Sequence, residues 1–402
     1  MTAVSAHGAT AAAAGSPVPD LRLLPAALVT WVVVLLGLHT GPAGGAVAIG
    51  AGSCALLAGL RRRAPILVAA AGCAVAAGLV VTAHTLALHG HPLRAAAERG
   101  AAATLTVVVR DDPRALRSGN ATGRPGTAQV LVPATLRAAA VGAGRWTGGG
   151  RVLLVAPEAG WSALLPGQEV RADGVLAPAA RADLTVAVLR VRGAPQAVGR
   201  APWWQTGAGT LRDGLRAAAA VLPPEPAGLL PGLAVGDTRD LPDEVRDDFR
   251  AAGLTHLVAV SGSNLAIVAG AVLGLLRLLR ADPRVAAVLS AAALVGFVVL
   301  ARPSPSVLRA AVMGGVVLLA LALGRARSAV PALAASVLGL LVVDPALATD
   351  PGFGLSVLAT AALVLVVPGW VARLRRYGVP PGVAEALAVP AAACLVTAPP
   401  PG

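Results

Sequence analysis

The sequence predicts a mainly α-helical membrane protein, a polytopic helix bundle with a small OB-like β-barrel inserted outside the cytoplasm. Three observations support this prediction. The 402 residues are 56% hydrophobic and only 13% charged, a composition far from that of soluble globular proteins. Long apolar runs occupy both ends of the chain, and short alternating segments separate them. Arginine clusters recur between the apolar runs, as expected where loops face the cytoplasm.

The charge and the motif content limit the classes of function. The net charge of +13 comes from arginine alone, because the chain contains no lysine. Excess arginine beside membrane spans follows the positive-inside rule, so a nucleic-acid partner is permitted by the charge and not shown by it. The three cysteines lie in apolar runs without a CxxC, and no HxHxDH, HExxH or Walker A motif occurs. We therefore expect no metal, no cofactor, and no nuclease or ATPase centre in this chain.

The segment 1–90 is predicted to hold the first membrane helices. Its apolar runs lie at about 24–39, 43–60 and 65–88. Residues 1–20 lack the apolar region of a signal peptide, so the first span is expected to stay in the membrane. Three arginines, Arg61 to Arg63, lie between the second and third runs. Placing them in the cytoplasm puts residue 90 outside.

The segment 91–200 changes from long apolar runs to short β-type segments. These are Thr104–Arg110, Gln129–Pro133, Arg151–Ala156, Glu169–Leu176 and Leu184–Arg192. Turns rich in glycine, proline and asparagine separate them, which predicts a small barrel, most simply an OB-fold. Arginines outnumber acidic residues here, which suits a nucleic-acid backbone, but only Trp146 and Trp161 offer stacking platforms. DNA contact and a structural or partner-docking role both stay open for this segment.

A linker of amphipathic helices is predicted for 201–253. Trp203 and Trp204 suit a membrane interface. Three apolar residues recur at i, i+4 and i+8 among charged neighbours: Leu241, Val245 and Phe249. We expect this helix to lie on the outer membrane surface.

The segment 254–402 is predicted to be a second membrane block, incomplete at its C-terminus. Its spans fall near 254–276, 285–301, 306–324, 328–343, 353–368 and 382–398. Arginine clusters follow every second span, at 277, 280 and 284, at 325 and 327, and at 373, 375 and 376. All of them can face the cytoplasm together with Arg61 to Arg63. Residues 91–253 are then expected outside, in a multi-pass protein of the plasma (inner) membrane.

The first span of the second block carries polar groups at membrane depth, namely His256, Ser261, Ser263 and Asn264. Such groups cost free energy without partners, so they are a functional hypothesis by default. Two interpretations stay open: interhelical hydrogen bonding or channel lining, and a membrane-embedded hydrolase with Ser261 as nucleophile and His256 as base. The same helix repeats small residues every fourth position, at Gly262, Ala266, Gly270 and Gly274. This stripe predicts close packing of another helix.

Further polar residues follow the Pro303–Ser306 break at the outer face. Arg309 lies one turn into the next span, where it either snorkels outward or faces a wet interior and meets a phosphate. The outer loop carries Asp344 and Asp350, a weak metal site without histidine. We expect these carboxylates to cap the next helix or to pair with Arg302 or Arg309.

Five motifs resemble those of the ComEC-type competence proteins, in the order found in that family. They are Leu230–Thr238 (LPGLAVGDT), Asp248–His256 (DFRAAGLTH), Ala259–Leu265 (AVSGSNL), Ser304–Ala310 (SPSVLRA) and Asp350–Ser356 (DPGFGLS). The resemblance implies an inner-membrane channel that passes single-stranded DNA into the cytoplasm during DNA uptake, with an OB-like outer domain. The predicted channel cluster is completed by Arg302, Arg309, Asp350 and Ser356.

The chain also departs from the family pattern. Asn264 stands where many members carry histidine, and Gly354 replaces a commonly larger polar residue. Members often continue into further spans and a nuclease domain, so a truncated, non-functional fragment remains an alternative. The resemblance implies as partners single-stranded DNA, the lipid bilayer, DNA-receptor proteins and cytoplasmic motor proteins, and it leaves a homo-oligomer open.

Overall fold

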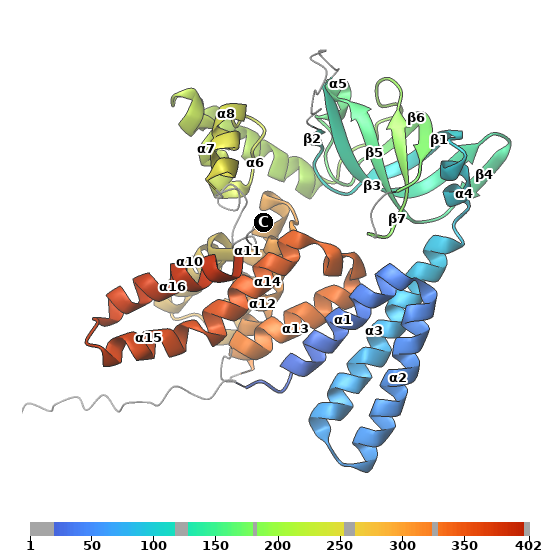
Figure 1. The fold of residues 1–402 in the computed structure, drawn as a ribbon. Coiled ribbons are helices and arrows are strands. Elements are labelled where there is room, and N and C mark those ends of the chain that lie inside the picture. Colours follow the sequence, from blue (N-terminus) through green and yellow to red (C-terminus); the bar gives the residue numbers. More distant parts are fainter. Residues whose placement is uncertain (1–19, 117–127, 180–182, 253–261, 324–328, 398–402) are drawn as a thin grey trace, which may run out of the picture.

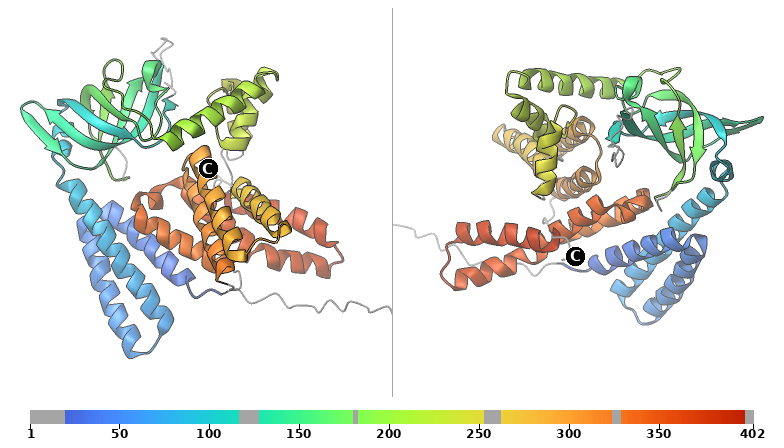
Figure 2. Two further views of the ribbon diagram at one scale, coloured as in Figure 1. Left: turned by 180° about the vertical axis from the view of Figure 1, so that it is seen from behind. Right: turned by 45° about the horizontal axis from the view of Figure 1, so that its top comes forward.

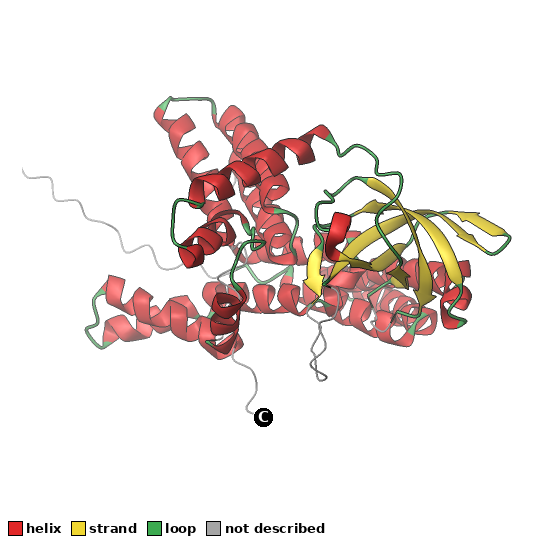
Figure 3. Cartoon of the chain, turned by 90° about the horizontal axis from the view of Figure 1, so that it is seen from above, coloured by secondary structure: helices red, strands yellow, loops and turns green. Residues whose placement is uncertain are grey.

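A computed structural model describes residues 20–116, 128–179, 183–252, 262–323 and 329–397. Helices account for 64% of them, which confirms the mainly α-helical prediction. One mixed sheet lies at one end of the long helices (Figure 1). The helices of residues 203–251, which follow the sheet in the sequence, lie on the same side of the long helices as the sheet does (Figure 2). Seen from that side, the sheet covers only part of the helices (Figure 3).

Three helices precede the sheet: α1 (Leu24–Thr40), α2 (Pro42–Arg61) and α3 (Pro65–His89). A proline stands in the first turn of each, where its missing N–H is not needed. Gly41 joins α1 to α2 with a φ of 71°, a conformation that favours glycine. A Cβ at Gly45 would come within 2.0 Å of the Thr82 hydroxyl, so α2 and α3 can pack this closely only without one. The three predicted apolar runs are therefore these helices.

Seven strands in the described residues form the sheet: β1 (Ala102–Val109), β2 (Arg114–Leu116), β3 (Gln129–Val141), β4 (Gly144–Thr147), β5 (Arg151–Pro157), β6 (Glu169–Ala177) and β7 (Thr185–Val191). All five predicted strands are present. Alternate side chains point into a core that contains Leu105, Leu154 and Trp161. β3 runs well past its predicted end at Pro133. Its burial alternation continues to Leu136, and after a bulge at Arg137 the strand goes on to Val141.

Five of the strands pair in a closed ring, in the order β1, β6, β7, β5, β3 and back to β1. β1 pairs antiparallel with both β3 and β6, β3 pairs antiparallel with β5, and β6 pairs antiparallel with β7. The parallel pair β5–β7 completes the ring. β2 and β4 add to β3 outside it. Two short helices accompany the sheet: α4 (Pro92–Glu98), which packs on β6 and β7, and α5 (Glu158–Trp161).

The predicted linker contains three helices: α6 (Trp203–Ala219), α7 (Pro224–Val235) and α8 (Asp243–Ala251). α7 ends at Gly236, which adopts a left-handed φ of 71° at the helix end. The chain then turns back onto α7, where a Cβ at Gly228 would lie 2.4 Å from the carbonyl oxygen of Asp240. This turn carries the residues around Asp237 towards α6.

The second helical block comprises α10 (Gly262–Leu278), α11 (Pro283–Ala301), α12 (Pro305–Ala322), α13 (Ala329–Val343), the 3-10 helix η1 (Pro345–Thr349), α14 (Pro351–Leu365), α15 (Val367–Arg376) and α16 (Pro381–Thr397). Each predicted span corresponds to a helix within the described residues, and the start of the first predicted span, 254–261, lies outside them. The sequence placed the last arginine cluster after a span ending near 368, whereas the chain there continues as α15. Trp370, Val371 and Leu374 explain the difference, because they recur at helical spacing and pack against α16.

Helices from before and after the sheet share one core. α1 packs against α13 and η1, and α3 also contacts α13. Within that core the rings of Trp31 and Phe353 lie 5.2 Å apart, and the Trp31 indole N–H donates to the carbonyl oxygen of Ala348 at 3.2 Å. The helices on either side of the sheet therefore form a single bundle.

Within the described residues four helical segments are long and apolar enough to cross a membrane: Pro42–Arg61, Pro65–His89, Pro283–Ala301 and Pro351–Arg376, the last of which combines α14 and α15. Shorter apolar helices accompany them, at Leu24–Thr40, Asn264–Leu278, Ser306–Ala322, Ala329–Val343 and Pro381–Leu395. Large apolar side chains such as Leu28, Val47 and Leu275 are exposed on their outer faces. So much exposed apolar surface suits lipid rather than water, and we conclude that this is a membrane protein.

Candidate functional site

Polar side chains gather at two places among the helices. The first, called the junction network below, joins the sheet to the helices and contains Asp112, Gln205, Arg212, Asp237, Arg239 and Arg302. The second, called the hydroxyl site, lies between α12 and α14 and contains Ser306, Arg309, Met313, Ser356 and Thr360.

Arg302 connects the end of α11 to the sheet. Its Nε lies 3.0 Å from the carboxylate of Asp112, in the turn after β1, and its Nη1 donates to the side-chain oxygen of Gln205. Arg302 is 6% exposed and has a φ of 70°, a backbone conformation that L-residues with side chains rarely adopt. Arg302 therefore makes its ion pair with Asp112 while its own backbone is in a strained conformation.

Arg212 of α6 extends the network across four segments. Its Nη2 lies 3.4 Å from Asp112 and its Nε lies 3.3 Å from Asp237. Its Nη1 donates to the carbonyl oxygen of Leu300 at 3.1 Å, in the last turn of α11, where carbonyls lack helical partners. One buried guanidinium thus links the sheet, α6, the turn after α7 and the end of α11.

Asp237 is the fully buried carboxylate of the network. Arg239 donates to it with Nε at 2.8 Å and Nη2 at 2.5 Å, and the Nε of Arg216 lies 3.6 Å away. Burial alone would raise the pKa of Asp237, but hydrogen bonds and charges from Arg239 and Arg212 hold this pKa well below its usual range. The carboxylate therefore stays ionised and anchors three arginines.

A second ionic contact holds the sheet to the helices at the end of α13. Asp344, at the end of α13, lies 2.6 Å from Nη2 of Arg151 and 3.8 Å from Nη2 of Arg110. Burial and the charge of Arg151 lower the pKa of Arg110, while Asp344 and Asp111 act in the opposite direction. Here the acid belongs to the helices and the arginines to the sheet, the reverse of the Asp112 contact.

The hydroxyl site is positioned by the start of α12. The Ser304 hydroxyl accepts from the backbone N–H of Val307 at 3.4 Å, a long capping contact, and Pro305 lies in the first turn. Arg309 consequently lies one turn inside the helix, as predicted. Its side chain is only 6% exposed, so it points into the bundle.

Arg309 is held by neutral groups. Its Nε and Nη2 donate to the Ser356 hydroxyl at 3.0 and 2.5 Å, and its Nη1 donates to the Thr360 hydroxyl at 2.7 Å. The Ser306 hydroxyl lies 3.2 Å from that of Ser356. Within the described residues the structure shows no carboxylate paired with Arg309. Its positive charge is therefore hydrogen-bonded but not neutralised.

Asp350 serves the hydroxyl site indirectly. Its carboxylate accepts from the backbone N–H of Phe353 at 2.7 Å and so caps α14, one of the two roles expected for it. The cap fixes the start of α14. Ser356 and Thr360, four residues apart, then lie on one face of that helix and meet Arg309.

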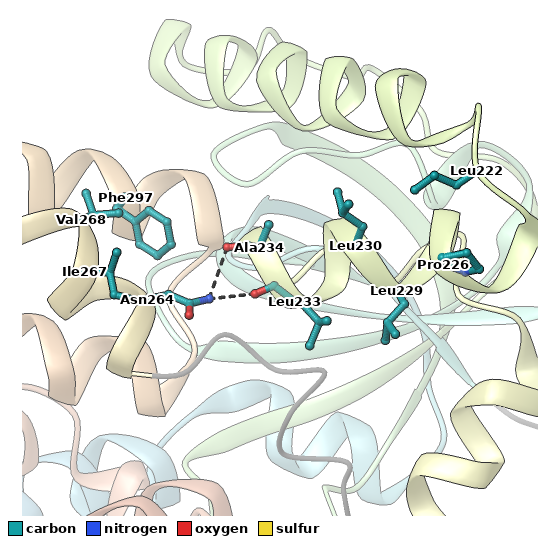
Figure 4. A pocket seen from close by; sticks show the side chains of 10 residues that line it. All are labelled: Leu222, Pro226, Leu229, Leu230, Leu233, Ala234, Asn264, Ile267, Val268 and Phe297. Carbon is teal, nitrogen blue, oxygen red and sulfur yellow. Dashed lines mark hydrogen bonds between the residues drawn. The ribbon is translucent and has the colours of Figure 1, made fainter. Parts of the chain in front are cut away.

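Asn264 ties α10 to α7. Its Nδ2 donates to the carbonyl oxygen of Leu233 at 2.8 Å (Figure 4). Beside it lies an open groove of about 580 Å³ whose lining is otherwise apolar: Leu222, Pro226, Leu229, Leu230, Leu233, Ala234, Ile267, Val268 and Phe297. Asn264 therefore makes the interhelical hydrogen bond that the sequence left open as one of its roles.

The predicted small-residue seam is present at one position. A Cβ at Gly262 would lie 3.2 Å from that of Ala310 in α12, whereas a Cβ at Gly270 or Gly274 would meet nothing within 4 Å. Ala266, Gly270 and Gly274 are exposed, so no helix of the described residues covers this face of α10.

Three other predicted site residues cannot be placed among the residues that the structure describes. His256 and Ser261 fall within 253–261, and the side chain of Ser263 is not described. Within the described residues no group of three or more histidine, cysteine, aspartate or glutamate side chains lies together as a metal site would need.

Asp112, Arg212 and Asp237 were missed as site residues by sequence reasoning. Asp237 lies in the LPGLAVGDT motif, which was the available signal. Asp112 and Arg212 lie in charged, amphipathic stretches that ordinarily face water. The Arg212 side chain is 3% exposed because segments far apart in the sequence surround it: the turn after β1, the turn after α7 and the end of α11.

Comparison with known proteins matches residues 233–401 to the family described as Competence protein. The chain is also similar to ComE operon protein 3 of Bacillus subtilis (strain 168), with 35% identity over 147 residues. That alignment covers 36% of this chain and 19% of the relative, so the chain spans about a fifth of that protein's length. No solved structure matches the chain. The matched segment contains the hydroxyl site, Asp237, Asn264 and Arg302.

Proposed function

We propose that this chain is the membrane component that passes single-stranded DNA into the cytoplasm during DNA uptake, a proposal supported by the match of residues 233–401 to the Competence protein family. The observation that carries the proposal is Arg309, which is buried in the bundle and, within the described residues, bonds to hydroxyls and to the Met313 sulfur but to no carboxylate. A guanidinium held this way keeps its charge and planar donor fork for a passing phosphate.

The sheet is proposed to be a small OB-like barrel. Its pairings form a ring through β1, β6, β7, β5 and β3, and the parallel pair joins β5 to β7. Such a ring encloses one core and leaves few open edges. It is held above the helices by ion pairs to Arg302 and Asp344.

The protein is proposed to be multi-pass, with residues 91–253 outside the cytoplasm. α11 ends at the junction network, so its first residue, Pro283, lies at the far end of a helix about 28 Å long. The arginines near that first residue, Arg280 and Arg284, are thus separated from the sheet by one helix length. Arg61 to Arg63 lie at the end of the α2–α3 hairpin away from the sheet (Figure 1). This arrangement agrees with the positive-inside rule.

Sidedness can be tested by thiol labelling. The natural cysteines, two of them exposed, are first replaced by alanine. Cysteine is then introduced at exposed Ala194 or exposed Arg62. In intact cells an impermeant maleimide should label A194C and leave R62C unlabelled until the membrane is opened. Labelling of R62C from outside would contradict the arrangement.

Transport itself is tested by complementation. A competent bacterium that lacks its own related protein receives this chain, and labelled DNA that becomes nuclease-protected in the cytoplasm is measured per molecule of expressed protein. The proposal predicts that uptake is restored above the vector control. Full expression in the membrane without any uptake would count against it.

A further inference from the structure

The carboxylate of Asp112 lies between two guanidiniums that come from a different part of the molecule. It is 3.0 Å from Nε of Arg302 and 3.4 Å from Nη2 of Arg212. The arginine side chains are 7% and 3% exposed, whereas that of Asp112 is 27% exposed. Asp112 belongs to the turn after β1, and the arginines belong to the helical part. Movement of this turn would remove the carboxylate and leave both arginines in place.

The two arginines differ in what they would keep. Arg212 would retain Asp237 and the Leu300 carbonyl. Within the described residues Arg302 would retain only the neutral amide of Gln205. A buried arginine without an anion is strongly unfavourable, so the vacated position would draw in another anion. Two adjacent guanidiniums match the oxygens of a phosphate group.

The backbone of Arg302 gives an independent reason to assign it a role. Its φ of 70° is one of few positive values at non-glycine residues in the described chain. Strained residues persist where the surrounding structure holds them, commonly at binding sites and switches. The strain here places a guanidinium beside Asp112, and Arg309 follows seven residues later on the next helix. The two arginines thus lie in succession from the sheet into the bundle.

We propose that Arg212 and Arg302 form a binding site for a backbone phosphate of the DNA strand, and that Asp112 closes this site in the conformation described. This inference rests on the proposed function. Asp112 stands in for the phosphate while no strand is present, so the incoming strand gains the site only by displacing the β1–β2 turn.

The test uses the purified full chain in lipid nanodiscs. Asp112→Asn removes the competing charge and should strengthen binding of a fluorescent oligothymidylate about tenfold, because a site closed about nine-tenths of the time becomes fully available. Inorganic phosphate should raise the thermal unfolding midpoint of D112N more than that of wild type. Adding Arg302→Gln to D112N should abolish both gains.

Asp111→Asn is the matched control, since Asp111 lies in the same turn but pairs with Arg114, whose side chain is 65% exposed. It should change neither readout. Equal gains in D111N and D112N would mean a general charge effect and would overturn the site, as would unchanged oligonucleotide binding by folded D112N. Stabilisation by phosphate without stronger oligonucleotide binding would overturn the assignment to DNA.

Should D112N fail to accumulate, Arg302→Gln in the wild-type background gives a second test. The site predicts weaker oligonucleotide binding and a salt dependence shallower by about 0.7 in the log–log slope, the value for one phosphate contact on a single strand. An unchanged slope would overturn the site. These binding measurements do not require transport, so they separate failure of this inference from failure of uptake in the complementation test.

Discussion

Arg302 and Arg309 are equally buried, each 6% exposed, yet the structure treats their charges in opposite ways. At the junction network Arg302 meets the carboxylate of Asp112, and neighbouring arginines share Asp237. At the hydroxyl site the oxygen partners of Arg309 within the described residues are the hydroxyls of Ser356 and Thr360. The junction therefore balances charge and holds segments together, whereas the hydroxyl site leaves a positive charge available.

The difference has an energetic basis. A buried ion pair offsets the loss of hydration of both groups, and removing one partner leaves the other uncompensated. Hydroxyl donors and acceptors satisfy the N–H groups of an arginine, but they supply no opposite charge. We interpret the Asp237 anchor of the junction as structural. The hydroxyl site is suited to a transient anion in the conformation described, whereas Arg212 and Arg302 become so only when Asp112 moves away. Three substitution or pH experiments sharpen this comparison.

The largest effect is expected where the junction loses its anchor. Asp237→Ala removes the carboxylate shared by Arg212, Arg216 and Arg239. It should destabilise the folded protein by about 3 kcal/mol, because the buried Arg212 guanidinium loses its nearer carboxylate and keeps the 3.4 Å contact with Asp112. The thermal unfolding midpoint of the purified protein in detergent measures this loss.

Asp240→Ala is the control for that change. Its side chain is 57% exposed and pairs with Arg216 at 3.2 Å, so its removal should cost about 0–1 kcal/mol. Equal melting of both variants would show that the junction does not depend on a buried anchor.

An intermediate loss of stability is expected where α10 packs against α12, the helix that carries Arg309. Gly262→Leu should cost about 1–3 kcal/mol, because its side chain would press on Ala310, beside Arg309. Gly270→Leu should leave the unfolding midpoint nearly unchanged, since its side chain would meet open space. A larger loss from G270L than from G262L would mean that another helix covers the exposed face of α10.

The smallest effect is expected from mild acid. The pKa of Asp237 lies below its unfolded value of about 3.9. Its stabilisation is therefore complete above that unfolded value and is lost as pH falls towards the folded one. The stability difference between wild type and D237A should stay constant from about pH 5 to 8 and shrink below about pH 4. A difference that already shrinks between pH 7 and 5 would contradict an ionised, anchored Asp237.

Most of the fold could be predicted from local patterns. Apolar runs located the helices, and alternation located the five main strands, because each pattern reflects burial within one element. α15 was missed because its charged face resembles a loop after a span. The continuation of β3 was missed because Ala138 to Ala140 carry little β signal.

The candidate site could be predicted only in part. Arg309 was found because a charge inside an apolar helix is conspicuous in sequence. Its partners Ser356 and Thr360 lie about fifty residues away, and no local pattern pairs them with it. Asp112 and Arg302 are 190 residues apart, so their contact depends on how the sheet docks. The spacing of Gly270 and Gly274 predicted packing that the structure shows only at Gly262, because periodicity marks a face without showing what covers it.

The central claim is that the charge of Arg309 serves the passing strand, and DNA uptake per expressed molecule tests it most directly. Arg309→Lys keeps the charge but loses the planar fork, so uptake should fall only partly. Arg309→Leu removes both, and uptake should fall about tenfold or more at equal membrane abundance. Arg373→Leu, at an exposed position in α15, is the matched control and should retain uptake. Wild-type uptake by R309L would contradict the account.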